Sequence, residues 1–314
     1  MEKSKLWILT NRNYEQRHWY DLVREWEDDI LKFESMNVSL DYEFPIFKNR
    51  NWQLVPGLFW ANLNKKHFPL LYFEMRANVF HFWKGGKTLV PWIIDWFVNP
   101  KYLWLYEWMY RKHRLVLVSS MEVYAYLKRQ SSNMNVEHLG LSLSDRYKIT
   151  KYDRFEKMYD VVLLGRQNET MMEYLNRYKE QHPNLSVYKP ARKDVDTREG
   201  YMREMRKGRI GIYAAPGFDA DAKRTHGFSQ VTPRFLEYVA SGCHIIARYM
   251  DNEDSKYYEL EKFSPSVENY GIFEKLMDKA LSTQVDMEFY ADYLEKHYTS
   301  TRCAKLKKIL NEYE

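Results

Sequence analysis

Glycine, arginine, threonine and glutamate residues gather where short apolar runs turn into helical stretches. Gly165 and Arg166 directly follow the apolar run at residues 160–164. A glycine at such a place lets the backbone turn tightly and approach a ligand. An arginine there can bind a diphosphate through two parallel hydrogen bonds. The alternative is an ordinary turn with a surface arginine, so the pair indicates a candidate phosphate site that needs support from elsewhere.

The support comes from residues 227–247, which begin at Gly227 and continue as a predicted helix from Thr232 to residue 240. Pro233 suits the first turn of a helix, because its missing N–H costs nothing there. Thr232 is the expected cap, Arg234 adds a full positive charge, and the N–H groups of the helix start favour phosphate. A carboxylate at Glu237 suits both hydroxyls of a ribose. An ordinary capped amphipathic helix with a buried apolar face is the alternative.

The elements that must position these residues alternate between strands and helices. We predict strands at residues 6–10, 88–94, 115–118, 136–141, 160–164, 185–188, 209–213 and 244–247. We predict helices at residues 14–35, 67–83, 102–112, 121–129, 170–182, 199–207, 232–240, 272–281 and from 289 to the end. This alternation is typical of parallel sheets flanked by helices, and two such units in tandem make an α/β protein of two Rossmann-like lobes.

Ligands of open parallel sheets lie outside the carboxyl ends of the strands. That rule selects residues that follow predicted strands or begin the helix at 232: Asn11, Arg12, Asp95, Ser119, Gly165, Arg166, Tyr213 and Thr232.

Composition divides the chain in the same way. The 314 residues are enough for two domains. Residues 1–152 hold 22 Lys and Arg against 16 Asp and Glu, and all ten tryptophans lie between Trp7 and Trp108, whereas the remainder is nearly neutral. The polar segment 142–155 reads as a linker, which predicts domains at 1–150 and 151–314.

The two cysteines indicate neither a disulfide framework nor a metal cluster, and no secretory signal or membrane span is visible. A cytoplasmic location is therefore expected.

The residues from Thr232 to Glu237, with the Ser241-Gly242-Cys243 turn that follows, resemble the donor-site helix of GT-B glycosyltransferases. The resemblance is closest to the family-4-like enzymes of bacterial capsule and O-antigen assembly, and it extends over residues 161–310. It implies a GT-B fold with a cleft between its lobes, an acceptor-binding first lobe, a donor-binding second lobe with closing helices, and a last helix that packs back on the first lobe.

The same resemblance implies a metal-independent, hexosyltransferase-type enzyme that needs no cofactor beyond a nucleoside-diphosphate sugar as donor substrate. It implies donor binding by Gly165, Arg166, Tyr213, Gly227, Thr232, Arg234 and Glu237, with Arg166 and Arg234 catalytic because they neutralise the leaving diphosphate. Many enzymes of the family carry a second glutamate where this chain has Ser229. The donor sugar and the stereochemical outcome are therefore left open.

Asp95 ends a predicted strand of the first lobe. It is a candidate general base for an acceptor hydroxyl, and a carboxylate that caps the next element is an equal alternative. We predict no metal site: no His, Cys and Asp cluster has ligand spacing, and Asp219 and Asp221 read as loop residues.

The basic, tryptophan-rich first half suits an anionic membrane surface, a sugar-stacking groove or a nucleic acid. The stretch 102–114 is its sharpest example, and a core helix with a basic end explains it equally well. The expected partners are a nucleotide sugar, a glycan or lipid-linked acceptor, and an anionic membrane surface on which the protein would be peripheral. No nucleic acid is expected. The rival functions are a basic aromatic nucleic-acid-binding module and a polyol-phosphate transferase or epimerase of the same fold.

Overall fold

The computed structural model describes residues 5–10, 18–33, 36–42, 69–77, 88–130 and 133–313. The chain forms two compact units. Unit 1 comprises Met1–Leu141 and Thr299–Glu314, and unit 2 comprises Ser142–Tyr298. Each unit is described by itself below. Asn11 and Arg12, which the sequence selected as candidates, lie outside the described residues.

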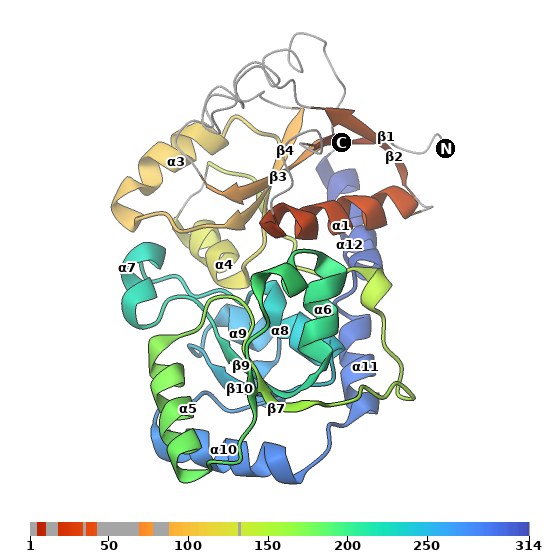
Figure 1. The fold of residues 1–314 in the computed structure, drawn as a ribbon. Coiled ribbons are helices and arrows are strands. Elements are labelled where there is room, and N and C mark those ends of the chain that lie inside the picture. Colours follow the sequence, from red (N-terminus) through yellow and green to blue (C-terminus); the bar gives the residue numbers. More distant parts are fainter. Residues whose placement is uncertain are drawn as a thin grey trace. The chain divides into compact units, whose positions relative to one another are not determined.

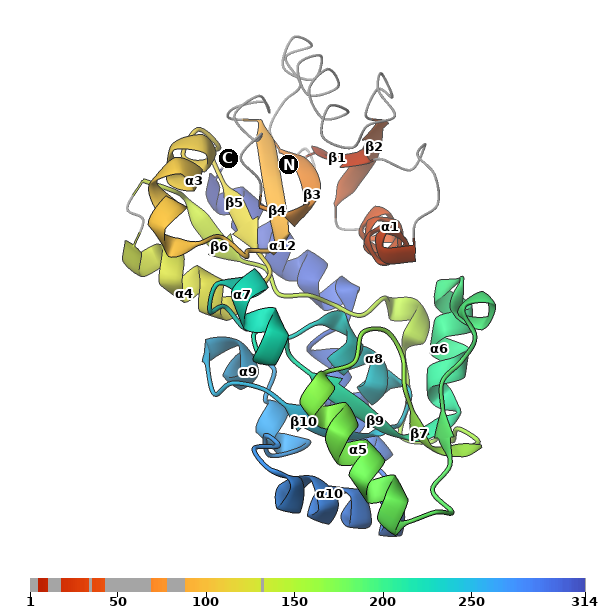
Figure 2. The ribbon, with the colours of Figure 1, turned by 60° about the vertical axis from the view of Figure 1, so that its left-hand side comes forward.

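Unit 1 contains a six-stranded parallel sheet in the order β2-β1-β3-β4-β5-β6 (Figure 2). The strands are β1 (Lys5–Thr10), β2 (Asn37–Tyr42), β3 (Leu70–Arg76), β4 (Leu89–Asp95), β5 (Val116–Val118) and β6 (Val136–His138). The helices are α1 (His18–Lys32), α3 (Leu103–Tyr110), α4 (Met121–Gln130) and α12 (Thr299–Tyr313). A single 3₁₀ turn, Pro100–Tyr102, leads into α3.

Tryptophan in unit 1 serves the core as well as the surface. Trp26 of α1 stacks on Trp92 of β4 with ring centroids 5.5 Å apart, and Phe73 of β3 lies 5.1 Å from Trp92. The indole N–H of Trp92 donates to the carbonyl of Leu139, so the buried polar atom of this ring is satisfied. The aromatic richness of the first half is therefore partly a packing feature.

The segment around β3 corrects the sequence reading, which predicted a helix over residues 67–83. Residues 70–76 instead form a strand that pairs with β1 on one side and β4 on the other. Leu70, Leu71 and Phe73 are buried. A strand that is covered on both faces reads as a continuous apolar run, which periodicity alone does not separate from a buried helix. Strand β2 was not predicted at all.

Unit 2 contains a four-stranded parallel sheet in the order β10-β9-β7-β8. Figure 1 labels β10, β9 and β7 of this sheet. The strands are β7 (Tyr159–Val162), β8 (Val187–Tyr188), β9 (Gly208–Ala214) and β10 (His244–Arg248). The helices are α5 (Glu169–Gln181), α6 (Arg198–Arg206), α7 (Ala222–Thr225), α8 (Pro233–Ala240), α9 (Glu253–Tyr257), α10 (Tyr270–Ser282) and α11 (Met287–Glu295).

Helix α8 is the most deeply embedded helix segment around the candidate site. All six residues from Phe235 to Ala240 are buried. Tyr238 packs over Gly211 of β9, where a Cβ would meet the tyrosine ring. Phe235 lies 5.7 Å from the ring of Tyr213 on β9. This packing fixes the axis of α8 against the sheet, and so fixes the direction in which its N-terminus points.

The unit boundaries differ from the predicted domains in two places. Residues 142–155, read as a linker, belong to unit 2, because Leu143, Tyr147 and Ile149 are buried in its core. Isolated apolar anchors of this kind carry no periodicity, so the sequence showed only the polar residues between them. The helix predicted from 289 to the end is two helices, α11 and α12. The second belongs to unit 1, as the resemblance implied for the last helix, and Cys303 and Leu306 enter its core.

Among the described helices, none combines the length and the apolar character that crossing a bilayer requires.

Candidate functional site

The turn after β7 is shaped by the guanidinium group beneath it. Gly165 has φ of +67°, a left-handed conformation that glycine adopts without steric penalty. A Cβ at this position would lie 2.9 Å from Cζ of Arg234. The sequence had assigned this glycine to a close approach between backbone and ligand. The structure shows a close approach between the backbone of Gly165 and the guanidinium of Arg234. The glycine is needed because a Cβ would block this contact.

Arg234 and Arg166, predicted to act together, are adjacent. The Nη1 group of Arg234 donates a hydrogen bond to the backbone carbonyl of Arg166 at 2.7 Å. Burial alone would lower the pKa of Arg234, but the neighbouring Tyr201, Tyr238 and Glu237 raise it overall. Its Nε atom is buried without a hydrogen-bond partner. Arg234 is therefore a permanently charged group that is fixed under the 165–166 turn.

Arg166 itself is held loosely. Its side chain is 70% exposed, and its Nη1 lies 3.3 Å from a carboxylate oxygen of Asp221. An exposed ion pair of this kind contributes about 0–1 kcal/mol, so the guanidinium can exchange Asp221 for another anion at small cost. Asp221 also pairs with Arg224. One arginine of the site is thus fixed and the other can adapt to a ligand.

The N-terminus of α8 is organised by a buried tyrosine rather than by a threonine cap. Thr232 occupies the N-cap position, but its side chain makes no capping hydrogen bond, contrary to the prediction. Its backbone N–H instead donates to the hydroxyl of Tyr213 at 3.0 Å. Burial raises the pKa of Tyr213 to about 12. Tyr213 is fully buried and positions the loop before α8, and its contact with the donor stays a prediction.

The loop that leads into α8 is tied down from α9. The side chain of Asp254 accepts a hydrogen bond from the N–H of Val231, and Asn252 donates to the carbonyl of Ser229 at 2.7 Å. In the first turn of α8, Pro233 has no N–H and the N–H of Phe235 binds the carbonyl of Thr232. The N–H of Arg234 is therefore the donor that remains among the first three residues of the helix.

Glu237 lies one turn further along α8 in a buried ion pair that the sequence did not indicate. Its Oε1 atom is 2.6 Å from Nη2 of Arg198, the first residue of α6. The two side chains are 4% and 14% exposed, respectively. Tyr201, also on α6, lies beside Arg234, and burial together with the charge of Glu237 raises its pKa to about 12. Helix α6 therefore contributes two residues to the site, and no local pattern around them pointed there.

The loop between β9 and α8 uses its acidic residues for its own structure. Asp219 has φ of +51° and accepts hydrogen bonds from Asn168, the N-cap of α5, and from Thr170. Within the described residues, no group of three or more His, Cys, Asp or Glu side chains is arranged to hold a metal ion. Gly227 has φ of +92°, with open space where a Cβ would stand.

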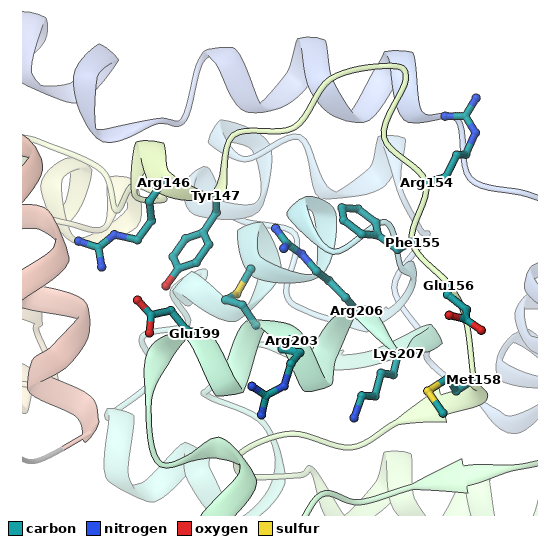
Figure 3. A pocket seen from close by; sticks show the side chains of 11 residues that line it. Arg146, Tyr147, Arg154, Phe155, Glu156, Met158, Glu199, Arg203, Arg206 and Lys207 are labelled. Atoms are coloured by element: carbon teal, nitrogen blue, oxygen red, sulfur yellow. The ribbon is translucent and has the colours of Figure 1, made fainter.

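A surface pocket of about 560 Å³ lies against α6, on a different face of the helix from Arg198 and Tyr201 (Figure 3). Its lining comes from one face of α6 and from the segment at residues 146–158, and it includes Tyr147, Phe155, Glu199, Arg203 and Arg206. None of the predicted donor-binding residues lines this pocket. Arg198 and Tyr201 of the same helix face Glu237 and Arg234 instead. The candidate site is therefore the region around the N-terminus of α8.

Asp95 lies in unit 1, at the carboxyl end of β4, where the sequence placed it. Its side chain is half-buried, and its backbone carbonyl accepts the N–H of Ala77. Ser119, which follows β5, is buried and donates to the carbonyl of Ile94. The strand ends of unit 1 thus present a carboxylate, and a catalytic role for it stays a prediction.

We expect Gly165→Ala to destabilise unit 2 by more than Gly227→Ala does. Both residues have a positive φ, so alanine costs ~1–2 kcal/mol at each. At position 165 the new methyl group must also displace the guanidinium of Arg234, whereas at 227 it meets no atom within 4 Å. Urea denaturation measures the difference. Equal losses in the two variants would contradict the close contact between Gly165 and Arg234.

No protein-family model matches this sequence, and neither does any curated protein. Solved structures do match. AviGT4, a glycosyltransferase involved in avilamycin A biosynthesis, is 8% identical with a TM-score of 0.59, and the match covers 98% of this chain and 97% of that chain. A Listeria monocytogenes protein provisionally assigned as UDP-N-acetylglucosamine 2-epimerase is 10% identical with a TM-score of 0.54, over 99% and 96% of the two chains.

The pneumococcal O-GlcNAc transferase GtfA, in complex with UDP and GlcNAc, is 12% identical with a TM-score of 0.52. The match covers 81% of this chain but 59% of GtfA, so the chain spans little more than half the length of that protein. Together with the two parallel sheets, these similarities confirm the predicted fold class, the α/β GT-B fold with two Rossmann-like units.

Proposed function

We propose that the protein is a glycosyltransferase whose unit 2 binds a nucleoside-diphosphate sugar. The observation that carries this proposal is the cluster at the start of α8. A fixed guanidinium from Arg234, an adaptable one from Arg166 and the N–H end of a helix converge on one glycine turn at the carboxyl end of β7. Two positive charges and a helix N-terminus favour a diphosphate.

The same cluster suits the chemistry of glycosyl transfer. When the bond between the anomeric carbon and the diphosphate breaks, negative charge develops on the leaving phosphate oxygen. Groups that are already in place to receive that charge lower the barrier without reorganising. Arg234 meets this condition because the carbonyl of Arg166 holds it beside Tyr201. Glu237 keeps its assignment as the ribose acceptor through Oε2, since Oε1 binds Arg198.

The acceptor in this proposal is a glycan or a lipid-linked glycan of bacterial surface polysaccharide synthesis. The resemblance of the α8 segment to family-4-like enzymes of capsule and O-antigen assembly supports it. Asp95 would take the proton from the acceptor hydroxyl. The structure of GtfA contains UDP and GlcNAc, which supports a nucleotide sugar as donor for this fold.

A sugar-nucleotide epimerase is the second candidate, because one structural neighbour of nearly equal length is assigned that activity. Incubation with a nucleotide sugar and a lipid-linked acceptor separates the two. A transferase releases the nucleoside diphosphate in step with the glycosylated acceptor. An epimerase returns an isomerised nucleotide sugar without needing an acceptor. Detection of that product would contradict the transferase and support the epimerase.

We expect turnover to be unchanged in EDTA. In the proposed site, Arg166 and Arg234 supply the positive charge that a divalent cation gives to the diphosphate in metal-dependent transferases. The measurement is the initial rate of nucleotide release with excess chelator and after adding back Mg²⁺ or Mn²⁺. A rate that collapses in EDTA and returns with the metal would contradict the arginine-only site.

A further inference from the structure

Large apolar side chains are exposed on α3 and at the end of the 3₁₀ turn before it. Tyr102, Trp104 and Trp108 are 46%, 66% and 50% exposed. Among the described residues, only two other large hydrophobic side chains are this exposed, and both lie in unit 2: Tyr152 and Met158. Exposed apolar groups that stand singly are normal, whereas a cluster marks a surface that contacts something else. The sequence alone did not separate this arrangement from a core helix.

Two basic residues lie on the same face of the helix as the two exposed tryptophans. The intervals along Lys101, Trp104, Trp108 and Arg111 are three, four and three residues, which is the spacing of neighbours on one side of a helix. All four are exposed. We call these four residues the α3 stripe. It consists of two indole rings with a cation at each end.

The opposite face of α3 fixes the helix to unit 1. Tyr110 is buried, donates to a carboxylate oxygen of Glu74 at 3.0 Å, and lies 5.9 Å from the ring of Trp96. The acidic residue of α3, Glu107, accepts hydrogen bonds from the side chain and backbone of Asn133. The α3 stripe is therefore a rigidly held surface, and Glu107, the carboxylate of α3, is already engaged.

Charge decides which partner suits this surface. Residues 99–114 contain four Lys and Arg against one Glu, which complements an anionic surface. A second copy of the chain suits it poorly: antiparallel pairing of two stripes would bring Lys101 of one copy beside Arg111 of the other. Tryptophan and tyrosine favour the boundary between lipid tails and water, and lysine and arginine are drawn to anionic headgroups.

We propose that the α3 stripe docks the protein on the surface of an anionic membrane. Helix α3 has eight residues, about 12 Å of length, so it lies in the interfacial layer and does not span it. The indole rings enter the headgroup region, and Lys101 and Arg111 contact lipid phosphates. Docking would bring the enzyme to a lipid-linked acceptor, and this purpose rests on the proposed function.

The test is flotation of the full-length protein with vesicles of phosphatidylcholine, alone or mixed with phosphatidylglycerol, at low and high salt. The variants are Trp104→Ser with Trp108→Ser, and Lys101→Glu with Arg111→Glu. Matched controls in unit 2 are Tyr152→Ser for the exposed aromatic, and Lys179→Glu with Lys189→Glu for the same change in net charge at exposed positions. Thermal unfolding of each variant checks that it folds.

We expect binding to mixed vesicles that weakens with salt. Each stripe variant should lose about tenfold or more in vesicle affinity, and both controls should bind like the wild type. No binding by the wild type, or equal binding by stripe and control variants, would overturn the proposal. So would a change in oligomeric state of the stripe variants without a change in vesicle binding, since the stripe would then join two copies. Nucleotide-sugar binding, measured without vesicles, tests the proposed function separately.

Discussion

Replacing Arg234 by alanine is expected to lower kcat by about 100-fold or more, which corresponds to ~3 kcal/mol of lost transition-state stabilisation. The guanidinium is held by the carbonyl of Arg166 beside Tyr201, so it is in place before charge develops on the leaving phosphate. Arg166→Ala should cost less, because that side chain is 70% exposed and its ion pair with Asp221 is weak. Initial rates at saturating donor measure both effects.

Two controls separate loss of charge from loss of structure in this experiment. Arg234→Lys keeps the charge but loses the planar donor fork, so it should recover part of the rate. Urea denaturation of each variant shows whether unit 2 remains folded. A folded Arg234→Ala enzyme with wild-type kcat would remove this residue from the mechanism.

Replacing Arg198 by alanine is expected to lower the free energy of unfolding by about 3 kcal/mol. The change leaves the carboxylate of Glu237, 4% exposed, without its partner at 2.6 Å. Arg203→Ala is the matched control on the same helix. Its side chain is 66% exposed, and its partner Glu204, although buried, also binds Lys207 and Tyr188, so a loss within about 0.5 kcal/mol is expected.

The double variant Arg198→Met with Glu237→Gln tests the pair as a unit. Removing both charges relieves the unpaired carboxylate, so the double variant should be more stable than Arg198→Ala. If Arg198→Ala and Arg203→Ala lose equal stability, Glu237 reaches solvent in solution and the pair is not a buried one.

The parts of the site that the sequence predicted have local signatures. Pro233 marks the first turn of α8, and Gly165 marks a turn after an apolar strand; both occupy the expected places. The rule that ligands gather at the carboxyl ends of parallel strands then selected Arg166. These features are set by residues close in sequence, so pattern alone was sufficient.

The parts that the sequence missed depend on contacts between distant segments. Arg198 and Tyr201 enter the site because α6 packs beside α8, and their sequence surroundings resemble any charged helix. The hydrogen bond from the N–H of Thr232 to the hydroxyl of Tyr213, 19 residues earlier in the chain, was missed for the same reason. Strand β3 was missed because a strand that is buried on both faces lacks the alternation of apolar and polar residues that marks a strand in a sequence.

The most direct test of the central claim, that unit 2 binds a nucleotide sugar at the start of α8, is a thermal-shift panel of UDP-, GDP-, dTDP- and CDP-linked sugars. A ligand at 100 times its Kd adds ~2.7 kcal/mol of stability. We expect one nucleotide class to stabilise the wild-type protein, and Arg234→Ala to lose that stabilisation while it stays folded. No stabilisation by any of the four classes at millimolar concentration, or equal stabilisation of Arg234→Ala, would contradict the account.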